Sequence, residues 1–473
     1  MKMLLDGKWV EKNKTISVTD PFDGSLVDTV PEADNDDVKL ALSSAVKGFN
    51  EIKSLPVHKR ASILYKTVEL LEEKKQEFAT LIARESSKTI TEAEGEVGRC
   101  INTLRVSAEE SKRILGETIP FDSFPGGEQK HGYYYRFPIG VILAITPFND
   151  PLNLVAHKLG PAFAAGNAVI LKPATVTPLS ALKLAELLVN AGLPPKALQV
   201  LTGRGHVLGK SLITDERVRM ISFTGGVEAG KKIAKLAGIK KIGMELGSNS
   251  PVIVWKDADL SNAVASCVSG AFWAAGQNCI GVQRIYLHKD IYEAFKKGFL
   301  KKTKTYTIGN KLDKNCDMGP VITEEEAKRV EEWIIDAKDK GATLLCGGNR
   351  NGAIVEPTVL EQVPENALIH KEEVFGPVVN LYAIDDFDDA IQKANSLPYG
   401  LHAAVFTKDI NLAFKAIKNL DCGSVIINDS TDYRLDSMPF GGVKHSGIGR
   451  EGIKFSLLEM TEPKVVCFHL DTS

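Results

Sequence analysis

The chain has 473 residues, which is more than one hydrophobic core usually contains, so we expect two large domains with a cleft between them. Apolar residues make up 44% and charged residues 25%, as in an ordinary globular protein, which argues against a disordered or fibrous chain. A net charge of −2 gives no overall field that would recruit nucleic acid or an anionic membrane, so neither partner is expected.

The cysteines and the N-terminal segment indicate a cellular location. Seven cysteines are scattered along the chain, with no CxxC pair and no Cys/His cluster at metal-ligand spacing. They predict a reducing compartment and no metal site. The first fourteen residues are mixed and charged, and no uncharged apolar run of about 18 residues follows. We therefore predict a cytoplasmic protein.

The N-terminal third of the chain has a helical pattern. Between residues 36 and 110, apolar side chains recur every three to four positions with charges between them, which predicts amphipathic packing helices. Residues 119–137 break the pattern with Pro120, Pro125 and two glycines, then run into Tyr133-Tyr-Tyr135. This segment predicts a loop and an exposed strand or ribbon, which is a candidate subunit contact.

From residue 140, strand and helix alternate. Strands are predicted at 140–145, 168–171, 197–202 and 218–224, with helices after Thr177-Pro178 (as N-cap and first helical residue), after Gly205 and after Gly226. This βαβ rhythm predicts a parallel sheet with ligands at the carboxyl ends of its strands. A second α/β unit is predicted from a strand at 251–255, a helix capped by Asp259 and a strand at 284–287.

Residues 223–232, Phe-Thr-Gly-Gly-Val-Glu-Ala-Gly-Lys-Lys, follow a strand and open a helix, where backbone N–H groups can hold a phosphate. The run nearly spells a P-loop from Gly225 to Lys231. However, Lys232 replaces the Ser/Thr that binds magnesium, and Glu228 would place a negative charge in the cradle, so ATP binding is disfavoured. A plain glycine turn remains the alternative.

Four other residues are candidates whose surroundings also fit plain structural roles. Lys172 ends a strand and could simply be solvated, and Asn149 could only form an Asx turn. Glu245 ends an apolar run, where an unpaired carboxylate is unfavourable. Cys279 lies in the small-residue loop Ala274-Ala-Gly-Gln-Asn-Cys279, although most free cysteines are only small buried apolar groups.

Taken together, these motifs resemble the aldehyde dehydrogenase superfamily over essentially the whole chain and in the family's order. The matching segments are Pro147–Asn149, Ile170–Thr175, Phe223–Gly226, Met244–Gly247, Gly276–Cys279, Glu372–Pro377 and Pro439–Gly447. Ser248-Asn249, and His157 before Lys158, resemble the lactaldehyde dehydrogenase-like branch.

The resemblance implies an α/β fold class with three parts. It implies a Rossmann-like NAD(P)-binding domain from residues 1–118 and 139–247, an α/β catalytic domain from 248–450, and a small β bridging arm from 119–138 and 451–473. It also implies a homo-oligomer, either a dimer or a tetramer, assembled through that arm.

The resemblance also implies covalent catalysis. The Cys279 thiolate would attack the aldehyde carbon, and the Asn149 amide with the Cys279 N–H would hold the oxyanion. Glu245 would then activate the water that hydrolyses the thioester. Lys158 would support the oxyanion or proton movement, and a purely structural role for it stays open.

The implied cofactor is NADP or NAD. Residues expected to contact it are Ile145, Thr146, Pro147, Lys172, Ala174, Thr175, Gly205, Gly209, Phe223, Thr224, Gly225, Gly226, Gly230, Leu246, Gly247, Glu373 and Phe375. Thr175 stands where members that prefer NAD commonly carry an acid that repels a 2′-phosphate. We therefore expect NADP to be accepted. Gly226 replaces a hydroxyl residue, so that phosphate contact would come from backbone.

The expected substrate is a small polar or anionic aldehyde of the lactaldehyde, sulfolactaldehyde or glyceraldehyde-3-phosphate type. Arg105 on an entrance helix and Arg434 in a loop beside the pocket would form a guanidinium clamp, unless they are surface arginines. Other expected substrate contacts are His157, Asn278 and Ile280. Asn278 argues against phosphate-specific members that place an arginine before the nucleophile.

Three alternatives remain. One is a CoA-acylating aldehyde dehydrogenase, and another is a succinate-semialdehyde-type dehydrogenase. The third is a catalytically silent structural or binding homologue, which would be expected to lack Cys279, Glu245 or Asn149, and all three are present.

Overall fold

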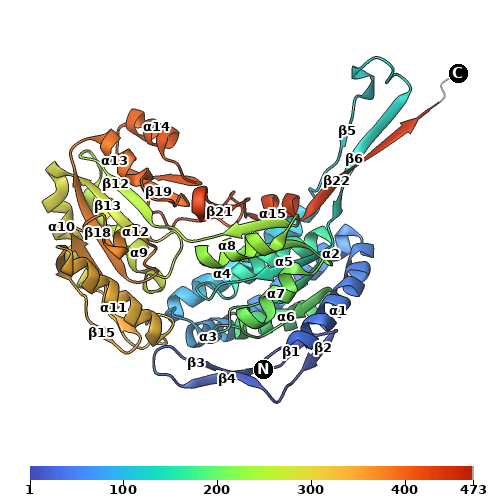
Figure 1. Cartoon of the computed structure of the whole chain (residues 1–473), viewed down its shortest axis with the longest axis horizontal. Helices are drawn as coiled ribbons and strands as arrows, with labels where there is room; N and C mark the ends of the chain where they lie inside the picture. Colours follow the sequence, from blue (N-terminus) through green and yellow to red (C-terminus); the bar gives the residue numbers. More distant parts are fainter. Residues whose placement is uncertain (471–473) are drawn as a thin grey trace.

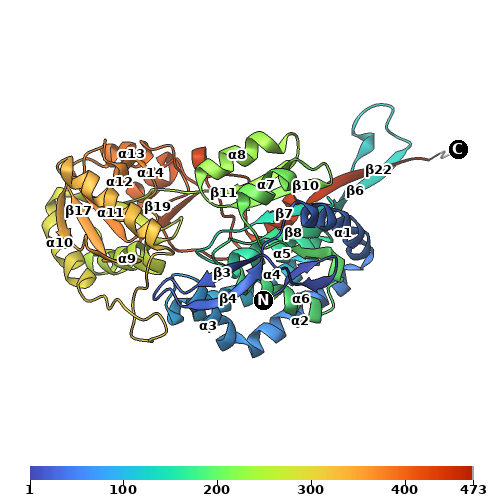
Figure 2. The same cartoon turned by 60° about the horizontal axis from the view of Figure 1, so that its bottom comes forward.

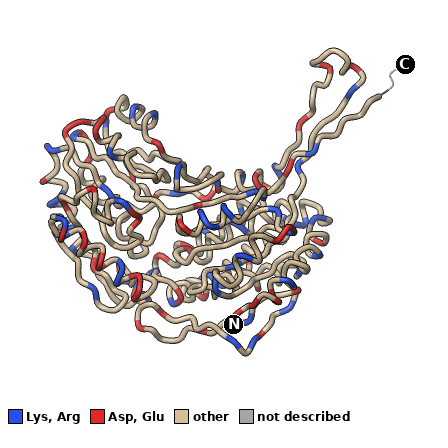
Figure 3. Tube along the Cα trace, in the orientation of Figure 1, with Lys and Arg blue, Asp and Glu red and all other residues tan. Residues whose placement is uncertain are grey.

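The computed structural model describes residues 1–470 and consists of two α/β parts and a projecting β arm (Figure 1). The two parts lie side by side, and their sheets and helices remain separate in a second view (Figure 2). Acidic and basic residues alternate along the trace in both parts, in keeping with the small net charge (Figure 3). Among the helices of residues 1–470, none is long and apolar enough to cross a membrane. The predicted α/β fold class is confirmed.

The first sheet has eight strands in the order β2-β1-β9-β8-β7-β10-β11-β21. Their bounds are Lys8–Val10 (β2), Met3–Leu5 (β1), Leu198–Val200 (β9), Ala168–Lys172 (β8), Val141–Ile145 (β7), Val218–Thr224 (β10), Lys241–Glu245 (β11) and Gly447–Ile448 (β21). The five strands from β9 to β11 run parallel. Since parallel strands end at one edge, Ile145 lies beside Phe223, and Thr224 lies beside Glu245.

Helices cover both faces of this sheet and form two apolar cores. One face packs against α2 (Val57–Glu73), α3 (Lys75–Glu85), α4 (Ile90–Ser111), α5 (Asn153–Ala165) and α6 (Leu179–Asn190). The other packs mainly against α1 (Asn35–Ser54), α7 (Gly205–Thr214) and α8 (Val227–Ala237). Every residue of α5 is buried, because this helix lies between the sheet and α4. The predicted helices between 36 and 110 are confirmed.

The second sheet has seven strands in the order β14-β17-β18-β13-β12-β19-β20. Their bounds are Thr343–Cys346 (β14), Thr358–Glu361 (β17), Val378–Ile384 (β18), Val282–His288 (β13), Ser250–Val254 (β12), His402–Phe406 (β19) and Ser424–Ile427 (β20). On one face lie α9 (Leu260–Phe272) and α10 (Lys289–Thr303). The other carries α11 (Glu324–Asp339), α12 (Leu368–Lys371), α13 (Phe387–Asn395) and α14 (Ile410–Asn419). The predicted cap of α9 is confirmed, since the Asp259 carboxylate accepts from two backbone N–H groups.

The arm is a three-stranded sheet that extends from the first part of the molecule (Figure 1). It contains β5 (Glu117–Thr118), β6 (Lys130–Pro138) and β22 (Thr461–His469). β22 is antiparallel to β6, with Thr461 opposite Pro138 at the base. The predicted exposed ribbon is therefore present. Two further hairpins are formed by β3 (Thr15–Thr19) with β4 (Leu26–Pro31), and by β15 (Arg350–Asn351) with β16 (Ile354–Val355).

Two sequence-based expectations differ from the structure. The segment before Thr461 was expected in the arm, but α15 (Ile453–Glu459) packs on α4 and α5, because Ile453, Leu457 and Met460 join the core of the first part. Also, α6 begins at Leu179 without a side-chain cap from Thr177 or Pro178. Instead, the carboxylate of Glu85 accepts from the N–H groups of Leu179 and Ser180, so a residue of another helix supplies the cap.

Candidate active site

Cys279 follows a left-handed turn that leads out of α9. Ala274, Ala275 and Gly276 have φ values of 49°, 55° and 70°. Residues other than glycine rarely adopt this backbone conformation. A Cβ on Gly276 would lie 2.1 Å from the Gly376 carbonyl oxygen, so only glycine fits there. The Glu92 carboxylate on α4 accepts from the Ala274 N–H at 2.7 Å. This sharp turn redirects the chain, and Cys279 then lines two adjoining cavities.

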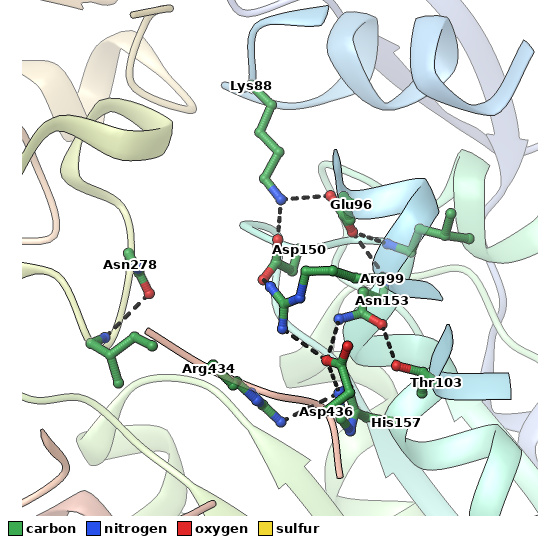
Figure 4. Close-up of polar contacts among 12 residues, drawn as sticks. Lys88, Glu96, Arg99, Thr103, Asp150, Asn153, His157, Asn278, Arg434 and Asp436 are labelled. Atoms are coloured by element: carbon green, nitrogen blue, oxygen red, sulfur yellow. Dashed lines mark hydrogen bonds and ion pairs between the residues drawn. The ribbon is translucent and has the colours of Figure 1, made fainter. Parts of the chain in front are cut away.

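Asn149 lies in the loop between β7 and α5. The neighbouring residue Asp150 fixes that loop (Figure 4). The Asp150 carboxylate pairs with the buried Lys88 ammonium, which also pairs with Glu96 at 2.6 Å. The other oxygen of Glu96 accepts from the N–H groups of Leu152 and Asn153, at the start of α5. Asn149 is buried and lines the same two cavities as Cys279.

Glu245 ends β11 and completes this group of three. Its side chain is buried, and its Oε2 has no hydrogen-bond partner within residues 1–470. Burial and the nearby negative charge of Glu451 raise the pKa of Glu245 well above its usual range, against the opposing charge of Arg434. A carboxylate with a raised pKa is a stronger base than an ordinary carboxylate, which suits it to proton transfer.

The thiol of Cys279 is in an environment that favours its neutral form. Burial raises its pKa, the negative charge of Glu373 adds to the effect, and Arg434 opposes it. The resting cysteine therefore holds its proton, which it must lose before it can act as a nucleophile.

A buried chain of ion pairs lies behind the three residues. The Lys158 ammonium contacts Glu451 Oε1 at 2.9 Å and the Ser222 hydroxyl at 3.1 Å. The other oxygen of Glu451 lies 3.4 Å from Arg434 Nη2. Although burial opposes ionisation, Lys158 and Arg434 lower the pKa of Glu451 to about 2. This carboxylate therefore stays charged and sustains the raised pKa of Glu245.

One of the two cavities has the walls that a nicotinamide dinucleotide requires. It measures about 400 Å³. It lies at the carboxyl ends of the central strands and includes apolar walls from Phe223, Leu246 and Phe375. The hydroxyls of Thr146 and Thr224 are buried in it with no partner in the part of the chain described. The Glu373 carboxylate lies over Gly247, only 2.2 Å from where a Cβ would stand, and accepts from Ser248 N–H. Free hydroxyls and a half-buried carboxylate acceptor fit a dinucleotide with ribose hydroxyl groups.

The second cavity, of about 370 Å³, shares Asn149, Glu245 and Cys279 with the first. Arg434 lines it with a side chain only 7% exposed, and its guanidinium stacks on the Phe440 ring at 3.7 Å. Arg99 of α4 lines it as well and pairs with Asp436 at 3.0 Å (Figure 4). Two guanidinium groups thus lie beside the nucleophile, which suits an anionic reactant.

A comparison with known protein families identifies the family of this chain. The family model described as "Aldehyde dehydrogenase family" matches residues 9–466. The chain belongs to the aldehyde dehydrogenase family. The expectation drawn from the sequence motifs is therefore confirmed.

Individual aldehyde dehydrogenases match nearly the whole chain. Aspartate-semialdehyde dehydrogenase 1 of Pseudomonas canavaninivorans is 51% identical over 455 residues, covering 96% of this chain and 97% of the relative. The 3-sulfolactaldehyde dehydrogenase of Priestia aryabhattai is 44% identical over 468 residues, covering 99% and 98%.

Solved aldehyde dehydrogenase structures superpose closely. Aldehyde dehydrogenase 21 from Physcomitrella patens, in complex with the reaction product succinate, has a TM-score of 0.97 at 41% identity and covers 99% of this chain and 98% of its own. Glyceraldehyde-3-phosphate dehydrogenase GapN from Methanocaldococcus jannaschii, complexed with NADP, has a TM-score of 0.93 at 40% identity and covers 97% and 100%.

The structure of this aldehyde dehydrogenase brings most of the expected cofactor residues to one cavity. Those that line it are Thr146, Pro147, Ala174, Phe223, Thr224, Gly225, Gly226, Leu246, Gly247, Glu373 and Phe375. Those outside its lining are Ile145, Lys172, Thr175, Gly205, Gly209 and Gly230. Gly230 packs on Leu246, where a Cβ would come within 2.7 Å. Burial lowers the pKa of Lys172 to about 8, and its ammonium donates to the Pro173 carbonyl.

Among the expected substrate residues of this aldehyde dehydrogenase, Asn278, Ile280 and Arg434 line the second cavity. His157 lies behind it and contacts Asp436 at 2.9 Å. Arg105 does not reach it, because its side chain is 43% exposed and pairs with Glu72 of α2 at 2.8 Å. The arginine of α4 that does line the cavity is Arg99, six residues earlier.

Sequence reasoning missed several lining residues of the second cavity. They are Arg99, Asp150, Trp273, Asp429, Asp432, Tyr433, Phe440 and Glu451. Arg99 had a usable signal, since Glu92, Glu96, Arg99 and Thr103 follow the 4-3-4 spacing of one helix face.

Within residues 1–470, no group of three His, Cys, Asp or Glu side chains could hold a metal ion.

Proposed function

We propose that this aldehyde dehydrogenase oxidises a small aldehyde with an anionic tail to the carboxylic acid, through a thioester on Cys279. The observation that carries the proposal is that Arg434 and Arg99 line the cavity that Cys279 also lines. The relatives named for sulfolactaldehyde and aspartate semialdehyde, and the structure that holds succinate, support an acidic tail on the substrate.

Cys279 supplies the nucleophile. The thiol loses its proton to solvent, and the thiolate attacks the aldehyde carbon to form a thiohemiacetal. Negative charge develops on the former aldehyde oxygen. The side-chain amide of Asn149, whose loop is fixed by Asp150 and Lys88, would donate to that oxygen.

The other cavity supplies the oxidant's binding site. Residues that would hold a nicotinamide dinucleotide include Thr146, Thr224, Leu246 and Glu373. A bound NAD or NADP would supply the acceptor for the hydride of the thiohemiacetal carbon, and loss of that hydride would leave a thioester on Cys279. Phe375, with φ of 47°, and Phe148 pack edge to face at 5.6 Å and close one wall of this cavity.

Glu245 completes the reaction as a general base. It removes a proton from a water molecule, whose oxygen attacks the thioester carbon, and the carbon–sulfur bond breaks to release the acid and the Cys279 thiolate. The raised pKa of Glu245 makes its carboxylate a stronger base. Lys158 acts indirectly, because its pairing with Glu451 keeps a negative charge near Glu245.

NADP is expected to be accepted alongside NAD. Thr175 carries no charge that would repel a 2′-phosphate, and its hydroxyl donates to the Gly203 carbonyl at 3.0 Å. Lys172 adds a buried ammonium group beside α7. Its Cε lies 3.8 Å from the Cβ position of Gly205, the first residue of that helix. The relative that was solved with NADP supports this assignment.

Hydrolysis is favoured over transfer to CoA because Glu245 lines the cavities beside Cys279. The test is an aldehyde panel assayed with NAD and with NADP, with and without CoA. Formation of NAD(P)H with an anionic aldehyde and no CoA supports the proposal. Activity that depends on CoA would assign the acylating reaction instead, and activity with uncharged aldehydes alone would contradict the anionic tail.

A homo-oligomer assembled through the arm is also part of the proposal. Apolar side chains of the arm are exposed, namely Tyr135, Phe137, Val465 and Phe468. Burying such a patch against a second copy would be favourable.

All seven cysteines are unpaired, which is consistent with the proposed cytoplasmic location.

A further inference from the structure

The cavity lined by Arg99 and Arg434 has more carboxyl groups than guanidinium groups. Two guanidinium groups, Arg99 and Arg434, share it with the five carboxyl groups of Asp150, Glu245, Asp429, Asp432 and Glu451. The arginines also already face carboxylates, since Arg434 lies 3.4 Å from Glu451 and Arg99 lies 3.0 Å from Asp436. A substrate with several negative charges and no positive charge would add to this excess.

Two of the acids have no cationic partner. Asp429 and Asp432 form no ion pair with any of residues 1–470, whereas Asp150 and Glu451 each pair with a buried lysine. Both belong to the loop after β20, which begins with Asn428 at φ of 58°. Asp429 accepts only from the next backbone N–H, that of Ser430, at 2.8 Å. These carboxylates are available to a ligand.

Asp432 lies against α9, the helix that precedes the nucleophile loop. Its Oδ1 lies 3.1 Å from the Cβ position of Gly270, and the Ser430 hydroxyl lies closer to that position, at 2.1 Å. Burial raises the pKa of Asp432, the Ser430 hydroxyl opposes this rise, and the charge of Asp429 adds a smaller increase. An unpaired carboxylate in such surroundings is unfavourable, and a bound cation would remove that cost.

Arg434 is an independent sign that a ligand completes this cavity. Its side chain is more than nine-tenths buried, yet its Nε finds no partner among residues 1–470. The cavity therefore offers an unsatisfied buried N–H donor and unpaired carboxylates, on the same side of Cys279. An anion and a cation on one small molecule would satisfy both.

We propose that the substrate is zwitterionic: its carboxylate binds Arg434 and Arg99, and its ammonium group binds Asp432 with help from Asp429. This inference rests on the proposed function and deepens it from an anionic aldehyde to an amino-acid semialdehyde. Asp432 is a specificity residue that contacts the substrate away from the reacting carbon.

Two aldehydes that differ by a single amino group test the proposal. They are 2-amino-4-oxobutanoate and 4-oxobutanoate, each assayed for kcat/KM with the full-length enzyme and NAD or NADP. The wild type is expected to favour the amino compound by about tenfold or more, as for a hydrogen bond to a charged group. Equal values for the two aldehydes, or a preference for 4-oxobutanoate, would overturn the proposal.

The variant Asp432→Asn keeps the size of the side chain and removes its charge. It is expected to lower kcat/KM for the amino compound about tenfold, mainly through KM, with little change for 4-oxobutanoate. Activity with 4-oxobutanoate then shows that the variant folds. A matched control is Asp385→Asn, an exposed acid on the second part paired only with Lys289, which should change neither value. An equal loss for both aldehydes in Asp432→Asn would contradict the ammonium contact.

Binding of the products keeps the two proposals distinguishable. L-aspartate and succinate are titrated into the enzyme by calorimetry, and L-aspartate is expected to bind more tightly, with that advantage lost in Asp432→Asn. If neither aldehyde is oxidised but this binding difference appears, the proposed reaction fails while the zwitterion site stands. Equal binding of the two acids would overturn the site.

Discussion

The carboxylate of Glu92 accepts a hydrogen bond of 2.7 Å from the backbone N–H of Ala274, although 182 residues separate them along the chain. Glu92 lies on α4 of the first part, and Ala274 lies in the left-handed turn that precedes Cys279. The same helix carries Glu96, which pairs with Lys88 and so acts on the Asn149 loop. One helix therefore positions the nucleophile and the proposed oxyanion donor relative to each other.

Replacing Glu92 by alanine should slow the chemical step. Loss of a hydrogen bond to a charged group costs about 1.5–3 kcal/mol, so kcat should fall about 10- to 100-fold, while KM for the cofactor should change little. Steady-state kinetics measure kcat and KM, and a thermal melt checks that the variant is folded. Glu94→Ala, two residues along the same helix and 4.0 Å from Lys314, is the matched control. An equal loss in both variants would argue against the positioning role.

The guanidinium groups of Arg434 and Arg99 should set the preference for an anionic tail. Replacing either by methionine should lower kcat/KM for a carboxylate-bearing aldehyde by about 10- to 100-fold, as expected for charge-assisted contacts. The control is Arg105→Met, because Arg105 pairs with Glu72 outside the cavity. If Arg105→Met lost as much activity as Arg99→Met, the assignment of the cavity would be wrong.

Cofactor preference should respond to charge at position 175. Thr175→Glu introduces a carboxylate where a 2′-phosphate is expected, and kcat/KM for NADP should fall about tenfold or more through repulsion. The value for NAD should stay within about threefold, which makes NAD the internal control. An unchanged NADP value would place the 2′-phosphate elsewhere.

The reactivity of Cys279 should depend on pH in a defined direction. Burial and the charge of Glu373 raise the pKa of the thiol, so alkylation by iodoacetamide should keep accelerating above neutral pH. Glu373→Gln removes a negative charge, which stabilises the thiolate and should move the profile to lower pH. Alkylation is measured without cofactor, and a profile that moves to higher pH would contradict this account.

The sequence predicts those parts of the fold and the site that depend on local patterns. Helix periodicity between 36 and 110, the Asp259 cap, the position of Asn149 in the loop after a strand and the position of Glu245 at a strand end are visible in short windows.

Long-range pairings could not be predicted in this way. Arg105 was expected at the substrate and Arg99 was not. The two positions are six residues apart on α4, so their side chains point about 120° apart around the helix axis. Which face of α4 meets the cavity depends on how the helix packs against α5 and α2. Glu451 is another example, because its partner Lys158 lies 293 residues away.

The covalent intermediate is the central claim, and the variant Glu245→Gln tests it most directly. Without the carboxylate that activates water, the thioester should accumulate when enzyme is mixed with an anionic aldehyde and NAD or NADP. Intact mass spectrometry should show the added acyl group, and peptide mapping should place it on Cys279. The account predicts this adduct together with a burst of NAD(P)H, and neither in the double variant that also carries Cys279→Ala. A burst without an adduct on Cys279, or with the acyl group on another residue, would contradict the account.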